Sequence, residues 1–130
     1  MLRRPVVRRA LKFAAVGTAG LVVNTAALYM LHGWARLPVP LASALAVELA
    51  IGHNYLLNDW WTFAVRRPSL QRFAKFNASA LGGLGVNVLT VWALIGFGTY
   101  LLVANALAVA VGFAVNFAFS ARWVWARRSR

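Results

Sequence analysis

The most constraining feature of this sequence is a series of four apolar stretches, each about twenty residues long. They cover approximately residues 13–31, 39–57, 76–97 and 100–119. An α-helix needs about twenty residues to cross roughly 30 Å of hydrocarbon. Lipid offers the backbone no hydrogen-bond partner, which favours helices, and the alternating polarity of membrane strands is absent from the sequence. The sequence therefore predicts an all-α integral membrane protein with four transmembrane helices.

Composition excludes several other classes of protein. Of the 130 residues, 62% are hydrophobic and 12% are charged, which is unlike a water-soluble domain. The length suits one domain, so we expect a single membrane domain over 1–130. There is no Cys, which excludes disulfides, Cys-ligated zinc and thiol catalysis. The two acids and two His are scattered, so we expect no enzyme, no metal site and no cofactor.

The 14 Lys and Arg residues lie beside the apolar stretches, and all except Arg36 fall on one predicted side of the membrane. These are Arg3, Arg4, Arg8, Arg9, Lys12, Arg66, Arg67, Arg72, Lys75, Arg122, Arg127, Arg128 and Arg130. Positively charged flanks stay in the cytoplasm. We therefore expect the cytoplasmic (inner) membrane, with both termini and a linker of about 64–75 in the cytoplasm. Juxtamembrane charges without a soluble domain also argue against nucleic acid as a partner.

The chain contains an internal repeat. With a shift of 63 residues, eight of the 16 positions in 9–24 are identical to those in 72–87. With a shift of 62, residues 42–61 align with 104–123, so that Asn54 meets Asn116 and Trp61 meets Trp123. We therefore expect two tandem two-helix repeats, about 9–63 and 72–125. Because each repeat has an even number of spans, both should insert in the same orientation.

Polar residues inside the spans are candidates for a substrate path, because ionisable and amide groups are costly in hydrocarbon. Helical spacing places Glu48, Gly52, Tyr55 and Asp59 on one face. Glu48 could be a coupling carboxylate, a contact for a translocated head group, or a hydrogen-bonded packing residue. Its equivalent in the second repeat is Ala110.

Four Asn residues recur in equivalent pairs, Asn24 with Asn87 and Asn54 with Asn116. Their amides should point into the helix bundle and bond between helices, where small residues let backbones approach closely. The glycines expected to do this are Gly17, Gly20, Gly82, Gly83 and Gly85. In the fourth span we expect the bundle-facing side to carry Asn105, Val109, Gly112, Asn116 and Ser120.

The cytoplasmic rim is the predicted anion site. Arg9 with Lys12, and Arg72 with Lys75, are spaced three residues apart near the expected starts of the first and third spans. A lipid phosphate would meet cationic donors there, together with free backbone N–H groups at the helix ends. The same charges could serve only to set topology. Four tryptophans at this level, Trp60, Trp61, Trp123 and Trp125, are typical of an interfacial aromatic belt.

The repeated motif resembles the GtrA-like membrane proteins. The first copy reads Lys12-Phe13, Gly17, Gly20, Asn24, then Asn54 and 58–63 (Asn-Asp-Trp-Trp-Thr-Phe); the second reads Lys75-Phe76, Gly83, Asn87, then Asn116 and 123–125 (Trp-Val-Trp). The resemblance covers about 8–125. This chain departs from the family pattern at Asp59, where the family usually has Arg, and at Ser120-Ala121, where the family has Asn-Arg. Arg122 is the candidate substitute for the missing Arg.

This resemblance implies a protein that translocates (flips) polyisoprenyl-phosphate-linked sugar across the membrane for cell-surface polysaccharide synthesis. It implies a membrane glycosyltransferase as a companion. Lipid-phosphate contacts would come from Arg9, Lys12, Arg72, Lys75 and Arg122, and the polar path from Glu48, Asn54, Tyr55, Asp59, Asn24, Asn87 and Asn116. We also expect a parallel homodimer, since four helices enclose little volume.

Two alternative functions remain open at this point. One is a scaffold for a membrane glycosyltransferase that does not itself transport. The other is a proton-coupled exporter similar to the small multidrug resistance family, which also has four short spans and one membrane carboxylate. Dual-topology assembly of such exporters requires a weak charge bias, whereas this chain has a strong one.

Overall fold

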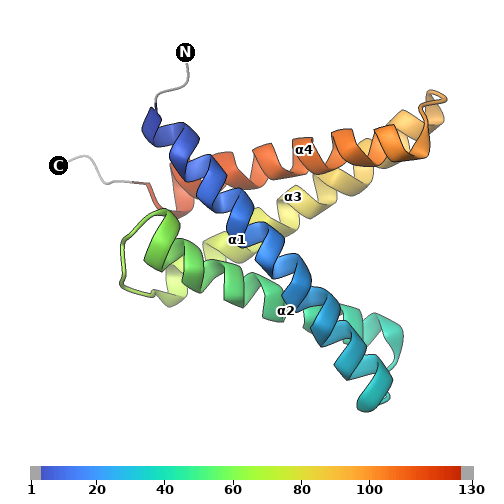
Figure 1. The fold of residues 1–130 in the computed structure, drawn as a ribbon, viewed down its shortest axis with the longest axis horizontal. Helices are drawn as coiled ribbons and strands as arrows, with labels where there is room; N and C mark the ends of the chain where they lie inside the picture. The colour runs from blue at the N-terminus through green and yellow to red at the C-terminus, as the bar shows by residue number, and fades with distance from the viewer. Residues whose placement is uncertain (1–3, 127–130) are drawn as a thin grey trace. The chain divides into compact units, whose positions relative to one another are not determined.

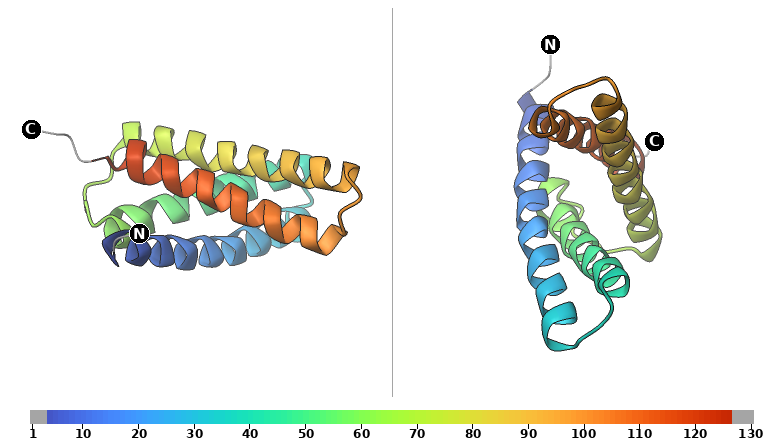
Figure 2. Two further views of the ribbon diagram at one scale, coloured as in Figure 1. Left: turned by 90° about the horizontal axis from the view of Figure 1, so that it is seen from above. Right: turned by 90° about the vertical axis from the view of Figure 1, so that its right-hand side faces the viewer.

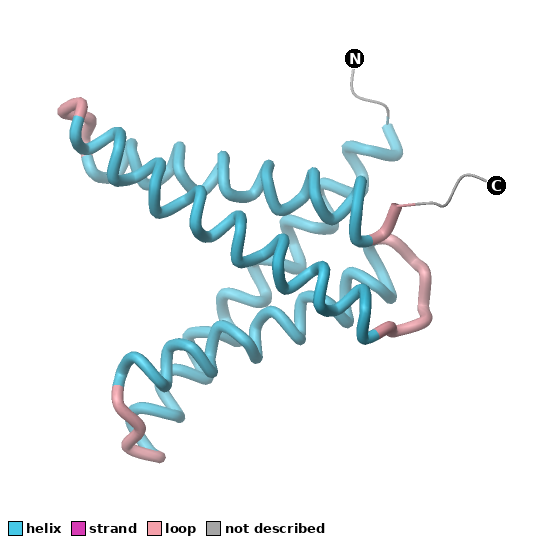
Figure 3. The backbone as a smooth tube through the Cα atoms, turned by 180° about the vertical axis from the view of Figure 1, so that it is seen from behind, coloured by secondary structure: helices cyan, strands magenta, loops and turns pink. Residues whose placement is uncertain are grey.

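The computed structural model describes residues 4–126, and over this range it is helical without a strand (Figure 3). Arg3, Arg127, Arg128 and Arg130, predicted to be cytoplasmic, lie outside the described residues. The helices are α1 (Arg4–Leu28), α2 (Val39–Leu57), α3 (Leu70–Gly96) and α4 (Leu101–Phe119). Three π-helical segments continue them, namely η1 (Tyr29–Trp34) after α1, η2 (Asn58–Thr62) after α2 and η3 (Ser120–Val124) after α4.

The chain divides into two compact units, with the boundary between Ser69 and Leu70. The first unit is a hairpin of α1 and α2, and the second is a hairpin of α3 and α4 (Figure 1). In each hairpin the two helices run side by side in opposite directions (Figure 2). The first hairpin therefore brings the start of α1 beside the end of α2, and the second does the same for α3 and α4.

Small residues at four-residue spacing form the buried face of each second helix. In α2 these are Ala42, Ala46 and Ala50, and in α4 they are Ala104, Ala108 and Gly112. The buried residues of the first helices are Phe13, Val16 and Gly20 in α1, and Phe76, Ser79 and Gly83 in α3. Small residues every fourth position allow two helix backbones to pack closely in a membrane. Each hairpin thus has its own tightly packed seam.

The seam corrects two expectations about helix faces. Asn105 and Val109 are exposed, and the buried line of α4 passes through Ala104 and Ala108 instead. Among the expected glycines, Gly20 and Gly83 lie at the seam, whereas a Cβ on Gly17, Gly82 or Gly85 would meet nothing within 4 Å. Both errors have one cause: all faces of a membrane helix are apolar, so hydropathy does not reveal which face is buried.

Three helical segments are long and apolar enough to cross a membrane: Arg4–Trp34, Leu70–Gly96 and Leu101–Val124. The predicted fourth span, α2, is not among them. At 19 residues α2 has the required length, and its bounds equal the expected 39–57. Glu48, His53 and Asn54 lower the mean hydropathy of α2.

The π-helical ends of α2 and α4 occupy equivalent positions in the two hairpins. The Phe63 amide donates to Asn58 O at 2.8 Å, and the Trp125 amide donates to Ser120 O at 2.9 Å. These bonds span five residues instead of four, which widens the last turn. Such turns are rare and occur frequently at functional sites. They carry the aromatic residues described next.

Candidate functional site

In the first hairpin, cations of α1 lie over aromatic rings at the end of α2. Lys12 Nζ is 5.2 Å from the centroid of the Trp61 ring, and Arg9 Cζ is 5.8 Å from that of Phe63. Phe13 meets Phe63 edge to face, with centroids 6.4 Å apart. The wide turn of η2 places Trp61 and Phe63 against α1. The face of an aromatic ring attracts a cation electrostatically but accepts no strong hydrogen bond from it. The N–H donors of Lys12 and Arg9 therefore stay available for another ligand.

The second hairpin repeats these contacts at equivalent positions. Lys75 Nζ lies 5.6 Å from the centroid of the Trp123 ring, and Phe76 packs on Trp125 at 5.3 Å. Lys75 and Phe76 follow Lys12 and Phe13 by 63 residues, and their ring partners are shifted by 62. Two of the five predicted phosphate-binding residues, Lys12 and Lys75, thus have the same type of partner in their own hairpins.

Free backbone N–H groups were expected beside both cation pairs, and the structure places only one pair near a helix start. The helix containing Arg9 and Lys12 is already formed at Arg4, so the backbone N–H groups at both positions lie within its hydrogen-bonded ladder. Free N–H groups beside this pair were therefore wrongly predicted, because polar residues before the apolar stretch also join the helix. In α3, which begins at Leu70, Arg72 does lie in the first turn, where N–H groups lack helical partners.

Sequence reasoning placed Arg66 on the cytoplasmic side but did not predict its contact with Trp60. Its guanidinium carbon is 5.9 Å from the Trp60 ring centroid, and its amide donates to Asp59 O at 3.1 Å. Arg66 and Ala64 have positive φ angles of 61° and 52°, which fold the linker back over η2. No sequence motif predicts the contact of Arg66 with Trp60, because the fold of the linker over η2 depends on the backbone conformation of loop residues.

Tyr55, predicted to lie on the polar path, joins α2 to the linker through hydrogen bonds. Its hydroxyl donates to Ser69 O at 3.0 Å and accepts from the Ser69 amide at 2.8 Å. The side chain is 2% exposed, so these bonds are shielded from water. The backbone of Ser69 therefore occupies the hydroxyl of Tyr55 as both a donor and an acceptor.

The other members of the expected polar face are distributed unequally. Glu48 is exposed and lies on the side of α2 opposite the buried alanines of the seam. Asp59, in contrast, is 1% exposed within η2. Asn58, also 1% exposed, accepts a hydrogen bond from Thr62 Oγ1 at 2.7 Å. The polar residues of α2 are thus concentrated at its π-helical end, and Glu48 lies apart from them.

The Asn residues lie at the helix seams. A Cβ on Gly20 would collide with the Asn54 amide, and a Cβ on Gly83 would come within 3.1 Å of Asn116 Cβ. In the amide orientation that satisfies both of its atoms, Asn54 Nδ2 donates to Val16 O of α1 at 3.2 Å. Asn116 Oδ1 accepts from Ser120 Oγ at 3.3 Å.

Asn24 and Asn87 are half-buried in the first helix of each hairpin. Asn87 Cβ would lie 3.1 Å from a Cβ on Gly112. The interhelical bond of Asn54 agrees with the expectation that these amides join helices. A part in a substrate path remains a prediction for all four.

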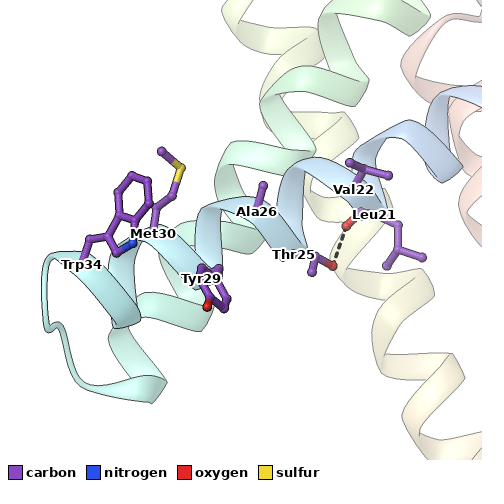
Figure 4. Close-up of a pocket in the computed structure, with 7 residues that line it drawn as sticks. All are labelled: Leu21, Val22, Thr25, Ala26, Tyr29, Met30 and Trp34. Carbon is purple, nitrogen blue, oxygen red and sulfur yellow. Dashed lines mark hydrogen bonds between the residues drawn. The ribbon is translucent and has the colours of Figure 1, made fainter.

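Open cavities lie on the helix surfaces, and two of them matter for a lipid ligand. One, of about 530 Å³, is lined by Ala118, Phe119, Arg122 and Trp123 at the end of α4 and in η3. The other is an apolar groove of about 620 Å³ along α1 and η1, lined by Leu21, Val22, Thr25, Ala26, Tyr29, Met30 and Trp34 (Figure 4). In that groove the Thr25 hydroxyl bonds to Leu21 O at 2.9 Å, so its donor is already used.

Within residues 4–126, no group of three or more His, Cys, Asp or Glu side chains is placed to hold a metal ion. The features at the helix ends are therefore cationic and aromatic. Cations beside Trp rings at the ends of membrane helices can hold a helix end at head-group depth and can bind a phosphate there.

Helices of this length and hydropathy, with cations and tryptophans at their ends, define a multi-pass membrane protein. Comparison with known families is more specific: residues 12–125 match the family described as GtrA/DPMS, transmembrane domain, and the chain belongs to that family.

A curated relative is the dolichol-phosphate mannosyltransferase of Pyrococcus furiosus. It is 36% identical over 120 residues, which cover 91% of this chain and 34% of the relative. The chain thus spans about a third of the length of this relative. Both comparisons connect the chain with membrane metabolism of polyprenyl-linked glycans, as the resemblance in the sequence implied.

Proposed function

We propose that the protein crosses the cytoplasmic membrane four times, as two tandem hairpins in the same orientation. The equivalent contacts of Lys12 with Trp61 and of Lys75 with Trp123 support the repeat. In the first hairpin Arg9, Lys12 and Arg66 lie at one end, and Arg36 follows the turn at the other. By the positive-inside rule, we expect the end with more cations to be cytoplasmic and both chain termini to lie inside.

The proposed activity is translocation of a polyprenyl-phosphate-linked sugar for cell-surface polysaccharide synthesis, without catalysis by this chain. The observation that carries this proposal is the Lys–Trp pair at the same end of both hairpins. The cation can bind the phosphate, while the indole ring holds the pair at head-group depth. The named relative, a dolichol-phosphate mannosyltransferase, supports a phosphorylated polyprenol as the lipid.

Each part of such a lipid has a matching surface in the hairpins. A phosphate would meet the cations predicted from the sequence within one hairpin: Arg9 and Lys12 in the first, or Arg72, Lys75 and Arg122 in the second. The hydrocarbon tail would lie in exposed apolar grooves such as that of α1 (Figure 4). The sugar hydroxyls would meet the accessible members of the predicted polar path, which are Glu48, Asn24, Asn54, Asn87 and Asn116. Tyr55 and Asp59 are buried and would support this path from within.

Reconstituted liposomes provide the test. A fluorescent short-chain polyprenyl-phosphate sugar is placed in both leaflets, and a membrane-impermeant reductant then measures the fraction that remains protected. We expect the protein to make all of the probe accessible and the double variant Lys12→Gln/Lys75→Gln to slow this. Arg8→Gln, which removes an exposed cation from α1, is the matched control. A protected fraction equal to that of empty liposomes would refute translocation.

A scaffold function is the second candidate, and the length of the relative favours it. In the Pyrococcus furiosus protein the matching region is about a third of a chain named as a mannosyltransferase. Here a separate membrane glycosyltransferase could take the place of the remaining two thirds, with this chain positioning it as part of a parallel homodimer. Co-purification of a glycosyltransferase with a chain that leaves the liposome probe protected would support this function.

A further inference from the structure

The cavity at the end of α4 combines one cation with apolar walls, and we call it the Arg122 cleft. It measures about 530 Å³ and is lined by Ala118, Phe119, Arg122 and Trp123. These residues come from little more than one helical turn. Phe119 and Trp123 meet edge to face, with ring centroids 6.4 Å apart, and each remains about half exposed. The cleft is therefore an open, preformed surface with a guanidinium at its rim.

The guanidinium of Arg122 is available to a ligand. It is exposed, and within residues 4–126 the structure gives it no hydrogen bond or ion pair. A guanidinium has five N–H donors, and its planar fork matches two phosphate oxygens. The ring of Trp123, which lines the cleft, also has Lys75 Nζ at 5.6 Å. Two positive charges thus flank one wall of an otherwise apolar cleft, which favours an anion with a hydrocarbon part.

An exposed apolar ridge leads along α4 to this cleft. Val103, Leu107 and Val111 follow one another at four-residue spacing and are each 42–52% exposed. Continued along the same face, the line reaches Ala118, one of the cleft residues. From Val103 to Ala118 the ridge is about 22 Å long at 1.5 Å per residue. That is long enough for several isoprene units lying along a single helix.

The first hairpin has no counterpart of this arginine at the equivalent position. A shift of 62 residues places Trp60 where the second hairpin has Arg122. There the Arg66 guanidinium lies 5.9 Å from the Trp60 ring. The two hairpins therefore share the Lys–Trp pair but differ one residue before the Trp, which makes the Arg122 cleft a feature of the second repeat.

We propose that the Arg122 cleft binds the phosphate end of a polyprenyl phosphate, with the chain lying along the α4 ridge. The guanidinium would contact the phosphate oxygens, and Phe119 and Trp123 would flank the first isoprene units. This rests on the proposed function and locates its cytoplasmic lipid-phosphate site in the second hairpin. A single arginine above a ridge one helix wide suits one phosphate on one chain better than a two-chain phospholipid.

The test is photolabelling of the full chain in phosphatidylcholine nanodiscs, with farnesyl phosphate carrying a diazirine near the phosphate. Labelled residues are located by mass spectrometry. Two variants address the two halves of the cleft: Arg122→Gln removes the charge, and Ala118→Trp fills the apolar side. Arg8→Gln is the matched control. We expect labelling at 118–123 to fall about tenfold in both cleft variants and to stay unchanged in the control.

Competition separates the possible outcomes. Unlabelled farnesyl phosphate should compete with the probe, whereas farnesol and phosphatidylglycerol should not. Wild-type labelling in Arg122→Gln, or equal competition by phosphatidylglycerol, would overturn the assignment of the cleft. Labelling confined to 9–13 and competed by farnesyl phosphate would overturn the cleft and leave the proposed function standing. If farnesyl phosphate competes with labelling nowhere in the chain, both proposals fail.

Discussion

The close approach of α3 and α4 at Gly83 and Gly112 provides a sensitive test of the second hairpin. A Cβ added to Gly83 would lie 2.8 Å from Gly112 O, and one added to Gly112 would lie 2.7 Å from Gly83 O. Ordinary contact begins at 3.4 Å, so in Gly83→Ala the distance from the new Cβ to Gly112 O must increase by about 0.6 Å. Because the obstacle is backbone on the partner helix, a change of rotamer cannot relieve it.

The expected cost follows from two opposing terms. Overpacking a close contact costs about 1–3 kcal/mol, while replacing Gly by Ala inside a helix gains about 0.5–1 kcal/mol. Gly83→Ala should therefore destabilise the protein by roughly 1–2 kcal/mol. Gly82→Ala is the matched control, because its Cβ would meet nothing within 4 Å and only the favourable term applies.

Reversible unfolding by sodium dodecyl sulfate in dodecylmaltoside micelles, followed by circular dichroism, can measure this difference. The free energies of unfolding of the two variants should differ by about 1.5–3 kcal/mol, with Gly82→Ala the more stable. If the two variants unfold within ~0.5 kcal/mol of each other, the close approach of α3 and α4 at Gly83 is refuted.

Three further predictions concern the first hairpin. Tyr55→Phe removes both hydrogen bonds to the Ser69 backbone, so trypsin should cleave the linker several-fold faster, and the free energy of unfolding should fall by about 1–2 kcal/mol. An unchanged cleavage rate would show that these bonds do not hold the linker against α2. Ala64→Gly should stabilise by about 1 kcal/mol in the same unfolding assay because φ is 52°, whereas Ala74→Gly within α3 should destabilise by ~0.5–1 kcal/mol. A double-mutant cycle of Lys12→Gln and Trp61→Leu should give a coupling of about 0.5–1 kcal/mol, and zero coupling would exclude the cation–π contact.

Much of the hairpin architecture could be predicted from the sequence, because helix length and the repeat are local signals. The bounds of α2 equal the predicted ones, and α4 starts one residue later than predicted and ends where expected. The sequence also predicted that the Asn amides lie where small residues let helix backbones approach closely, and Gly20 and Gly83 are the small residues beside Asn54 and Asn116. These features depend on residue size and spacing, which a sequence displays directly.

Rotation about the helix axis was harder to predict. The polar Asn105 favours a buried face of α4 that contains it, yet the buried line runs one residue earlier, through Ala104. In lipid the outward face is as apolar as the seam, so neither polarity nor hydropathy fixes the rotation. The contact of Arg66 with Trp60 was missed for a different reason, because it depends on left-handed residues in the linker.

The five-residue hydrogen bonds that close α2 and α4 have a consequence for tolerated changes in length. Helix termini usually accept insertions and deletions well, because little follows them that must keep its direction. Here the segments 58–62 and 120–124 contain the rings of Trp61 and Trp123, which contact Lys12 and Lys75. Deleting one residue would either rotate everything after it by about 100° or tighten the turn to the α form and remove its five-residue hydrogen bond. Single-residue deletions should therefore be rejected at these two helix ends, although substitutions of their outward-facing side chains are accepted.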